Sequence, residues 1–191
     1  MKAVLKNETK VITGKVRLSY ANIFEPKSIN GSEPKYSVSL IIPKSDKQQI
    51  KVIEEAIANA KERDKSKWNG KVPANLKTPL RDGDEERPED ENYANSYFLN
   101  ANSTKAPAVV GLEMDTATGK AIPLGSDDVY SGCYARVSIN FYGFNTAGNK
   151  GIACGLGNIQ KVDDGERLGG GSSAEDDFEF DEVDAEDDFL S

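Results

Sequence analysis

The stretch YARVSINFYGFNTAGNKGIACGL, residues 134–156, decides the fold of this chain. Its first half alternates small or apolar side chains with polar ones, and the apolar set is Ala135, Val137, Ile139 and Phe141. Its second half repeats the pattern at Ile152, Cys154 and Leu156. The residues between the halves, 145–149, are of the kinds that form tight turns. A period of two on both sides of a turn predicts a β-hairpin with one buried face.

Two further half-buried strands are predicted nearer the N-terminus, at Thr9–Tyr20 and Lys35–Pro43, where apolar and polar side chains again alternate. In the first of them the alternation places Tyr20 on the apolar face. A turn-rich segment, residues 25–34, separates the two strands. Short strands are also expected at Tyr97–Asn100 and Pro107–Val110.

The periodicity changes after Pro43. Apolar side chains then recur at helical spacing, at Ile50, Ile53, Ile57 and Ala60. Ser45 and Gln48 have the spacing of a capping box, in which Ser45 caps the helix and Gln48 reaches back to it. We therefore predict one amphipathic helix, roughly residues 46–64.

One helix among five to seven short strands makes the chain mainly β and favours a small barrel or a curled sheet. Strands and helices do not alternate, so a parallel doubly wound sheet is not expected. An acidic segment, residues 82–92, contains Gly and Pro and is expected to be an exposed loop insertion. Residues 169–173 have the composition of a flexible linker, and the remainder that of a disordered acidic tail. The sequence thus predicts a domain, 1–162, followed by a linker and tail, 163–191.

The net charge of −8 conceals a basic body and an acidic tail. Residues 163–191 carry 13 acidic side chains and a single basic one, Arg167. Residues 1–162 carry 23 basic and 19 acidic side chains, and 7 of those acidic ones lie in residues 82–91. The rest of the body is therefore strongly basic, which is common in proteins that bind polyanions.

The composition excludes several classes of function. The chain has no histidine, which removes catalysis by a histidine base and metal sites with histidine ligands. Two cysteines are too few for a structural zinc site. Neither an apolar leader nor an 18-residue apolar run occurs, so we expect a cytoplasmic protein that does not bind membranes. No cofactor, no metal and no enzymatic activity are expected.

The polar face of the hairpin carries an unusual mixture of side chains: Arg136, Asn140, Tyr142 and Phe144. Single-stranded nucleic acid is bound by rings that stack on bases and by cations that follow the phosphates. The alternative for the two rings is packing beneath a loop or the helix. Further cations that could extend this face into a basic stripe are Lys15, Arg17, Lys35 and Lys150. We predict that these eight residues bind single-stranded DNA.

Two other functions stay open on sequence alone. A metal-dependent nuclease would use the carboxylates of Asp82, Asp84 and Glu86, although these lack the ligand spacing of a helix-loop-helix calcium site. An acidic interaction protein that mimics DNA would fit the net charge, but the basic body argues against it.

The tail sets apolar side chains among carboxylates. The residues that we expect to contact a partner are Phe178, Phe180, Asp187, Asp188, Phe189 and Leu190. Such a tail suits docking into a basic, apolar pocket of another protein. It also suits competition with DNA for the protein's own cationic groove, because a tethered polyanion has a high local concentration.

Several longer motifs resemble those of a family of phage and prophage single-stranded-DNA-binding proteins. The motifs are Val16–Pro26, Lys35–Asp46, Leu80–Asp84, Val129–Tyr134, Val137–Tyr142 and Asn149–Gly155. The resemblance covers nearly all of residues 1–162. It implies an OB-like β-barrel that coats single strands during replication or recombination, without catalysis and with little sequence preference.

The tail resembles the acidic tails of bacterial and phage single-strand-binding proteins, which implies that it recruits replication or recombination proteins. This chain ends in Phe189-Leu-Ser191 rather than in a terminal Phe, which departs from that pattern. The predicted helix also follows the second strand, whereas a minimal OB barrel has three strands before its helix. The sequence leaves strand order unassigned and a homo-oligomer open.

Overall fold

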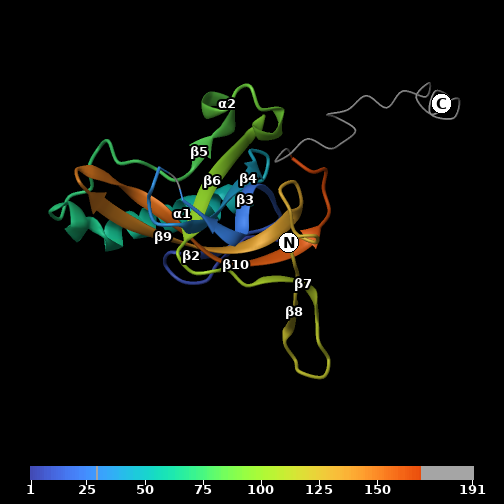
Figure 1. Cartoon of the computed structure of the whole chain (residues 1–191). Helices are drawn as coiled ribbons and strands as arrows, with labels where there is room; N and C mark the ends of the chain where they lie inside the picture. Colours follow the sequence, from blue (N-terminus) through green and yellow to red (C-terminus); the bar gives the residue numbers. More distant parts are fainter. Residues whose placement is uncertain (29, 169–191) are drawn as a thin grey trace, which may run out of the picture.

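The computed structural model describes residues 1–28 and 30–168, so the predicted linker and most of the tail lie outside the described residues. Five long strands form a closed barrel (Figure 1): β3 Val16–Lys27, β4 Lys35–Pro43, β6 Ser96–Ser103, β9 Tyr134–Thr146 and β10 Asn149–Asp163. Around the barrel the order is β3-β4-β6-β10-β9, and β9 pairs again with β3. All of these pairings are antiparallel except that of β6 with β10, which is parallel.

The hairpin predicted at residues 134–156 is confirmed, and it is longer than expected. β9 and β10 pair from Thr146 and Asn149 down to Tyr134 and Asp163. Ala147 and Gly148 form the turn with φ values of 51° and 86°, a left-handed pair that matches the twist of a two-residue hairpin. This hairpin supplies two of the five barrel strands.

Short strands extend the barrel at two edges. β1 Val4–Leu5 and β2 Lys10–Ile12 add to β9 on one side. β7 Val109–Met114 and β8 Ala121–Pro123 add to β10 on the other side and project from the body as an arm, here called the β7–β8 arm (Figure 1). The strand expected at Pro107–Val110 overlaps the start of β7, but the polar residues between β7 and β8 interrupt the alternation, and the rest of the arm is not predicted from the sequence.

The prediction of one strand over Thr9–Tyr20 is wrong. The chain leaves the sheet after Ile12 and re-enters it at Val16. Between them Thr13 is buried and bonded to the neighbouring strand: its hydroxyl accepts from the amide N–H of Val137 at 2.9 Å. β3 then continues to Lys27, into the segment expected to be a turn.

The amphipathic helix is confirmed as α1 Lys47–Arg63, between the second and third barrel strands. It buries Ile50, Ile53, Ile57 and Ala60 against the barrel, as their spacing predicted. The capping box is wrong, because the side chain of Asp46 rather than Ser45 accepts from the helix, at the amide of Gln49. Gln48 instead bonds both backbone groups of Ala3 at 3.1 and 2.9 Å, which fastens the N-terminal segment to the helix.

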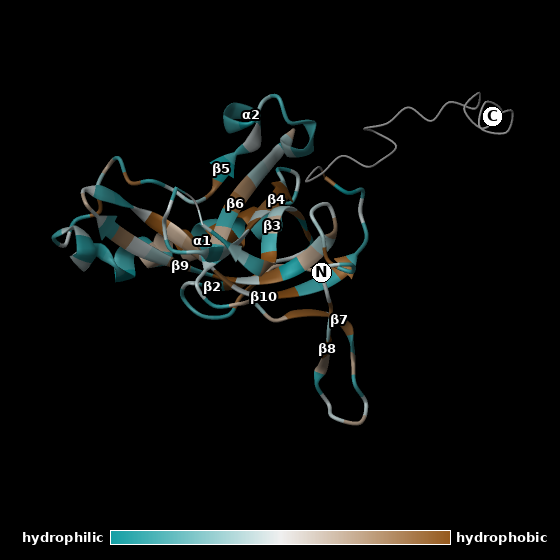
Figure 2. Ribbon diagram, in the orientation of Figure 1, coloured by the Kyte–Doolittle hydropathy of each residue, from teal (hydrophilic) through white to brown (hydrophobic). Residues whose placement is uncertain are grey.

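The acidic segment is more structured than the exposed loop predicted. After β5 Arg81–Asp82 it forms α2 Gly83–Glu86 and the 3-10 turn η2 Glu91–Tyr93. The Tyr93 ring is fully buried and meets Phe98 edge to face with 5.2 Å between centroids. Ile41 completes this small cluster on the outer surface of the barrel. Most of the carboxylates stay exposed, with Asp82 and Asp90 half-buried, and α2 with its neighbouring loop is coloured hydrophilic in Figure 2.

Both cysteines are buried free thiols, and burial raises the pKa of each above its ordinary value. No helix in the described part of the chain is long and apolar enough to cross a membrane. Residues 163–168 continue along the barrel: the amide of Leu168 donates to the carbonyl of Ser131 at 2.9 Å, and Asp164 accepts from the hydroxyl of Tyr130.

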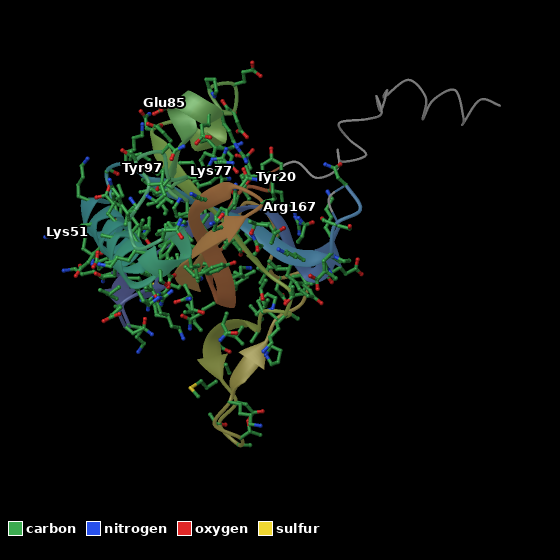
Figure 3. The ribbon with its side chains drawn as sticks, turned by 90° about the vertical axis from the view of Figure 1, so that its left-hand side faces the viewer. Tyr20, Lys51, Lys77, Glu85, Tyr97 and Arg167 are labelled. Atoms are coloured by element: carbon green, nitrogen blue, oxygen red, sulfur yellow. The ribbon has the colours of Figure 1, made fainter. Side chains whose placement is uncertain are left out.

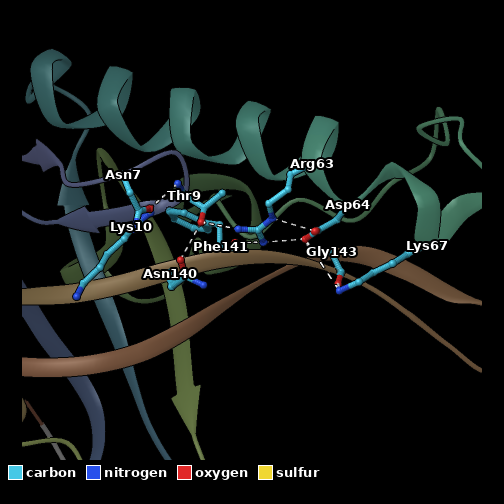
Figure 4. A network of polar contacts seen from close by, with 9 residues as sticks. All are labelled: Asn7, Thr9, Lys10, Arg63, Asp64, Lys67, Asn140, Phe141 and Gly143. Atoms are coloured by element: carbon cyan, nitrogen blue, oxygen red, sulfur yellow. Dashed lines mark hydrogen bonds and ion pairs between the residues drawn. The ribbon is translucent and has the colours of Figure 1, made fainter.

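A buried carboxylate ties the end of α1 to the barrel (Figure 4). Asp64 accepts from the guanidinium of Arg63 through both oxygens at 2.9 Å and from the amide of Gly143 at 2.7 Å. These bonds hold the pKa of Asp64 at about 2, below its ordinary 3.8. Trp68, in the 3-10 turn η1 Lys65–Trp68, covers the same glycine so closely that a Cβ on Gly143 would lie 2.8 Å from its ring.

We predict that Asp64→Asn destabilises the protein by about 2 kcal/mol at pH 7, because the amide keeps the shape but loses the charge. The folded-state pKa is the lower one, so the ion pair stabilises above about pH 4 and its contribution disappears as the pH falls toward 2. Urea denaturation of both proteins at several pH values measures this difference. Glu62→Gln removes the exposed pair with Lys65 and is the matched control, expected to change stability by less than about 0.5 kcal/mol. A difference for Asp64→Asn that is constant from pH 7 to pH 3 would contradict the assignment.

Candidate nucleic-acid interface

A row of small polar residues crosses the outer surface of all five barrel strands. Consecutive members are direct sheet partners, and the row is Asn140, Gly155, Asn102, Ser37 and Asn22. Every one of them is half-buried, whereas their sequence neighbours Ile139, Cys154, Ala101, Val38 and Ile23 are buried. The row is therefore a shallow floor that any extended ligand crosses without meeting a bulky side chain.

Two hollows lie over the part of this floor formed by Asn22, Ser37 and Asn102. The first, of about 620 Å³, opens toward β3 and includes Asn22, Ser37 and Lys35. The second, of about 970 Å³, opens toward β10 and includes Lys77, Tyr97 and Ala153, together with the carboxylates of Asp82, Glu85 and Glu86. Asn100 and Asn102 of β6 line both hollows, so the two adjoin there and are together called the groove.

Tyr20 stands at the β3 side of the groove, and its placement corrects the sequence prediction. The prediction put Tyr20 on the buried face with Val16 and Leu18, but its side chain is 60% exposed. The cause is local: the pairing of β3 with β4 is irregular between Ser19 and Asn22, and Tyr20 has a φ of 47°. A left-handed backbone is rare for a bulky side chain and is found mostly at functional sites. The irregularity turns an aromatic ring outward beside the floor.

Arg87 joins the acidic insertion to this ring. Its guanidinium lies 5.0 Å from the ring centre of Tyr20, 4.5 Å from that of Tyr93 and 4.6 Å from that of Phe98. Arg87 also lines the first hollow. The basic residue within the acidic segment thus faces the groove, and cation–π contacts hold it there.

Several groove cations have no ion-pair partner among residues 1–28 and 30–168. Lys27 and Lys35 stand at the β3–β4 end, and Lys77 stands on the β10 side. Lys150 lies beyond Lys77, whose amide donates to the Lys150 carbonyl at 3.2 Å. Figure 3 shows Lys77 and Tyr20 on the half of the molecule opposite the β7–β8 arm, below Glu85 of the acidic insertion.

Of the eight site residues predicted from sequence, Lys35 lines the groove and Asn140 belongs to its floor. Tyr142 is 36% exposed, and its ring lies close to Gly155 of the floor. Phe144 is half-buried and covers Gly151, where a Cβ would lie 2.9 Å from the ring. Phe144 thus packs against strand β10 rather than beneath a loop or the helix, and Tyr142 is accessible.

The structure does not bring the other three cations to the groove. Arg136 donates to the carbonyls of Thr13 and Lys2 at 2.9 and 3.1 Å, four residues along β9 from Asn140. Arg17 donates to the carbonyls of Gly132 and Glu166, and Lys15 pairs with Asp163 at 3.2 Å. The partners of all three are groups of the protein itself, and those of Lys15 and Arg17 include Asp163 and Glu166 of the segment that lies against the barrel.

The carboxylates of the nuclease hypothesis are likewise paired with cations. Lys44 contacts Asp82 and Asp84, each at 2.8 Å, and this raises the pKa of Lys44 and lowers the pKa of both carboxyls. Glu86 pairs with Arg81 at 2.6 Å. Within the described residues, no three acidic or cysteine side chains gather as a metal site would require. The tail residues Phe178, Phe180, Asp187, Asp188, Phe189 and Leu190 lie outside the described part.

Known proteins similar to this chain come from phages. Putative protein p50 of Acyrthosiphon pisum secondary endosymbiont phage 1 is 32% identical over 177 residues, which cover 86% of this chain and 89% of the relative. The solved single-stranded-DNA-binding protein from bacteriophage Enc34 is 26% identical with a TM-score of 0.71, covering 96% of this chain and 93% of its own. Its complex with single-stranded DNA has a TM-score of 0.73 at 23% identity, covering 87% of this chain and 93% of the other.

The family comparison agrees with these similarities. The family described as Enterobacter phage Enc34, ssDNA-binding protein matches residues 9–190, nearly the whole chain. The OB-like barrel expected from the sequence is confirmed by the likeness to the Enc34 structures. The chain therefore belongs to the family of single-stranded-DNA-binding proteins represented by that of Enterobacter phage Enc34.

Proposed function

We propose that the groove across β3, β4, β6 and β10 is where this protein, a phage single-stranded-DNA-binding protein, holds its strand. The observation that carries this proposal is the half-buried row from Asn22 to Asn140, which crosses five strands without a large side chain. The family match and the Enc34 protein's complex with single-stranded DNA support the choice of ligand. The OB fold also binds oligonucleotides on the face of its second and third strands, here β4 and β6.

The strand would enter at Lys27 and Lys35, cross the floor, and leave past Lys77 and Lys150. Tyr20 and Tyr142 stand at its two sides, where each ring is free to stack on a base. Stacking accepts every base, and lysines contact phosphates as point charges. This chemistry favours binding with little sequence preference, as needed to coat strands during replication or recombination.

We propose further that the protein acts without catalysis, in the cytoplasm of the phage's host. Residues 1–162 would form the DNA-binding domain and 163–191 the linker and tail. The tail would recruit replication or recombination proteins through Phe178, Phe180, Phe189 and Leu190 and their acidic neighbours Asp187 and Asp188. Because the tail is strongly acidic, it would also compete with DNA for the groove cations.

The first prediction concerns the rings. Tyr20→Ala and Tyr142→Ala should each weaken binding to oligo-dT by about 5- to 100-fold, since stacking contributes roughly 1–3 kcal/mol per base. Fluorescence anisotropy with a short labelled oligo-dT measures the affinity. Tyr20→Phe and Tyr142→Phe keep the ring and are the matched controls, expected to bind within about twofold of the unmodified protein. Unchanged affinity in a folded Tyr20→Ala variant would remove Tyr20 from the site.

The second prediction separates unpaired groove cations from paired ones. Lys35→Gln and Lys77→Gln should each weaken binding and reduce the slope of log affinity against log salt by about 0.7, the value for one phosphate contact on a single strand. Lys15→Gln is the matched control, because Lys15 is equally exposed but pairs with Asp163. If Lys15→Gln lowers the slope and the groove variants do not, the phosphates follow the surface of Lys15 and Arg17 instead of the groove.

The third prediction concerns the tail. A chain ending at Leu168 keeps the contacts that residues 163–168 make with the barrel. It should bind oligo-dT more tightly than the full chain, and the gain should shrink as salt rises, because screening weakens the competing charge. A neutralised tail, with its Asp and Glu after Leu168 replaced by Asn and Gln, should bind like the truncated chain. Equal affinity of full-length and truncated chains at low salt would refute the competition.

A further inference from the structure

The β7–β8 arm exposes apolar side chains that no part of the barrel covers. Leu112 is 57% exposed, Met114 60% and Ile122 39%. Leu112 and Ile122 also line a hollow of about 370 Å³ at the base of the arm, whose floor includes Leu124 and Val162. Apolar groups on a projecting hairpin contribute nothing to this chain's own core, so their burial requires another molecule.

The charges of the arm argue against DNA as that molecule. Glu113 lies between Leu112 and Met114 and has no ion pair among the described residues, whereas Asp163 and Asp164 at the rim of the hollow are paired with Lys15 and Lys161. The unpaired carboxylate of Glu113 repels phosphates. The arm also contributes no residue to either hollow of the groove. A protein surface with apolar side chains among lysines would bury the apolar side chains of the arm and pair with its carboxylate.

One such surface in the described part of this chain lies at the N-terminus. Of the other exposed large apolar side chains, Tyr20 lines the groove, Tyr142 lies beside Gly155, and Phe24 lies late in β3, close in sequence to the groove residue Lys27. Apart from these and the side chains of the arm, the exposed large apolar side chains are Met1, which is 66% exposed, and Val4, which is 45% exposed on the outermost strand β1. Lys2 and Lys6 flank them, and neither lysine has an ion pair among the described residues.

We infer that the β7–β8 arm of one copy docks on strand β1 of the next copy. Val4 and Met1 would enter the hollow at the arm's base, and Lys6 would face Glu113. If the arms of two copies met each other instead, Glu113 of one copy would lie near Glu113 of the other, and the like charges would repel. A contact between two different patches repeats from copy to copy, which suits a protein that coats a strand. The inference rests on the proposed function and predicts cooperative coating.

The test compares a short oligo-dT that holds one copy with a long oligo-dT that holds many. Leu112→Ser with Met114→Ser should leave affinity for the short strand within about twofold and weaken binding to the long strand by at least about tenfold, since neighbour contact acts through effective concentration. Ala117→Ser, at the tip of the same arm, is the matched control. Circular dichroism checks that the exposed substitutions leave the fold intact.

Charge reversal identifies the partner patch. Glu113→Lys and Lys6→Glu should each weaken binding to the long strand by about threefold, and the chain carrying both should recover, because the pair is restored in the opposite sense. If the arms of neighbouring copies contacted each other instead, the chain carrying both substitutions would not recover long-strand binding. If the arm variants left long-strand binding unchanged, the docking of arm on β1 would be refuted, and the proposed DNA-binding groove would be unaffected. Loss of short-strand binding in the unmodified protein would instead refute the proposed function.

Discussion

Closure of the barrel by the β9–β10 hairpin is the constraint on which the rest of the structure depends. β9 pairs with β3 and β10 pairs with β6, so one hairpin makes both contacts that complete the ring. Its register decides which face of every neighbouring strand points outward, because a shift of one residue exchanges the buried and exposed sets. The groove floor is therefore fixed by backbone pairing rather than by side-chain contacts. The Asp64 contacts with Arg63 and Gly143 then join the end of α1 to β9.

Different kinds of residue form different parts of the groove. Small side chains form the floor, exposed rings stand beside it, and lysines without an ion pair among the described residues stand at its ends. The acidic insertion lines the second hollow with Asp82, Glu85 and Glu86. Lys44 and Arg81 pair with Asp82 and Glu86, and Arg87 faces Tyr20 on the first hollow. The insertion thus presents both carboxylates and a cation to the groove.

The sequence predicts the regular parts of this molecule well. Alternation identified the long hairpin, and helical spacing identified the buried face of α1, since both depend only on local periodicity. It failed for Tyr20, whose direction depends on an irregular pairing with β4. It located only the start of the β7–β8 arm, at Val109 and Val110, because the rest of the arm buries little and leaves no pattern. It also could not separate Lys35 from Arg17 and Arg136, because the backbone carbonyls that hold the two arginines come from distant segments. A sequence shows which residues are cationic, but which group each cation binds depends on the fold.

The most direct test of the groove is to find which rings the DNA touches. An oligo-dT that carries 5-iododeoxyuridine, cross-linked by light to the full chain and analysed by mass spectrometry, reports aromatic side chains stacked on bases. The groove predicts cross-links at Tyr20 and Tyr142. Tyr130 and Tyr134, which lie beside Arg167, Lys15 and Arg17, should remain unmodified. Cross-links confined to Tyr130 and Tyr134 would place the DNA on the surface of Lys15, Arg17 and Arg167 instead and contradict the account.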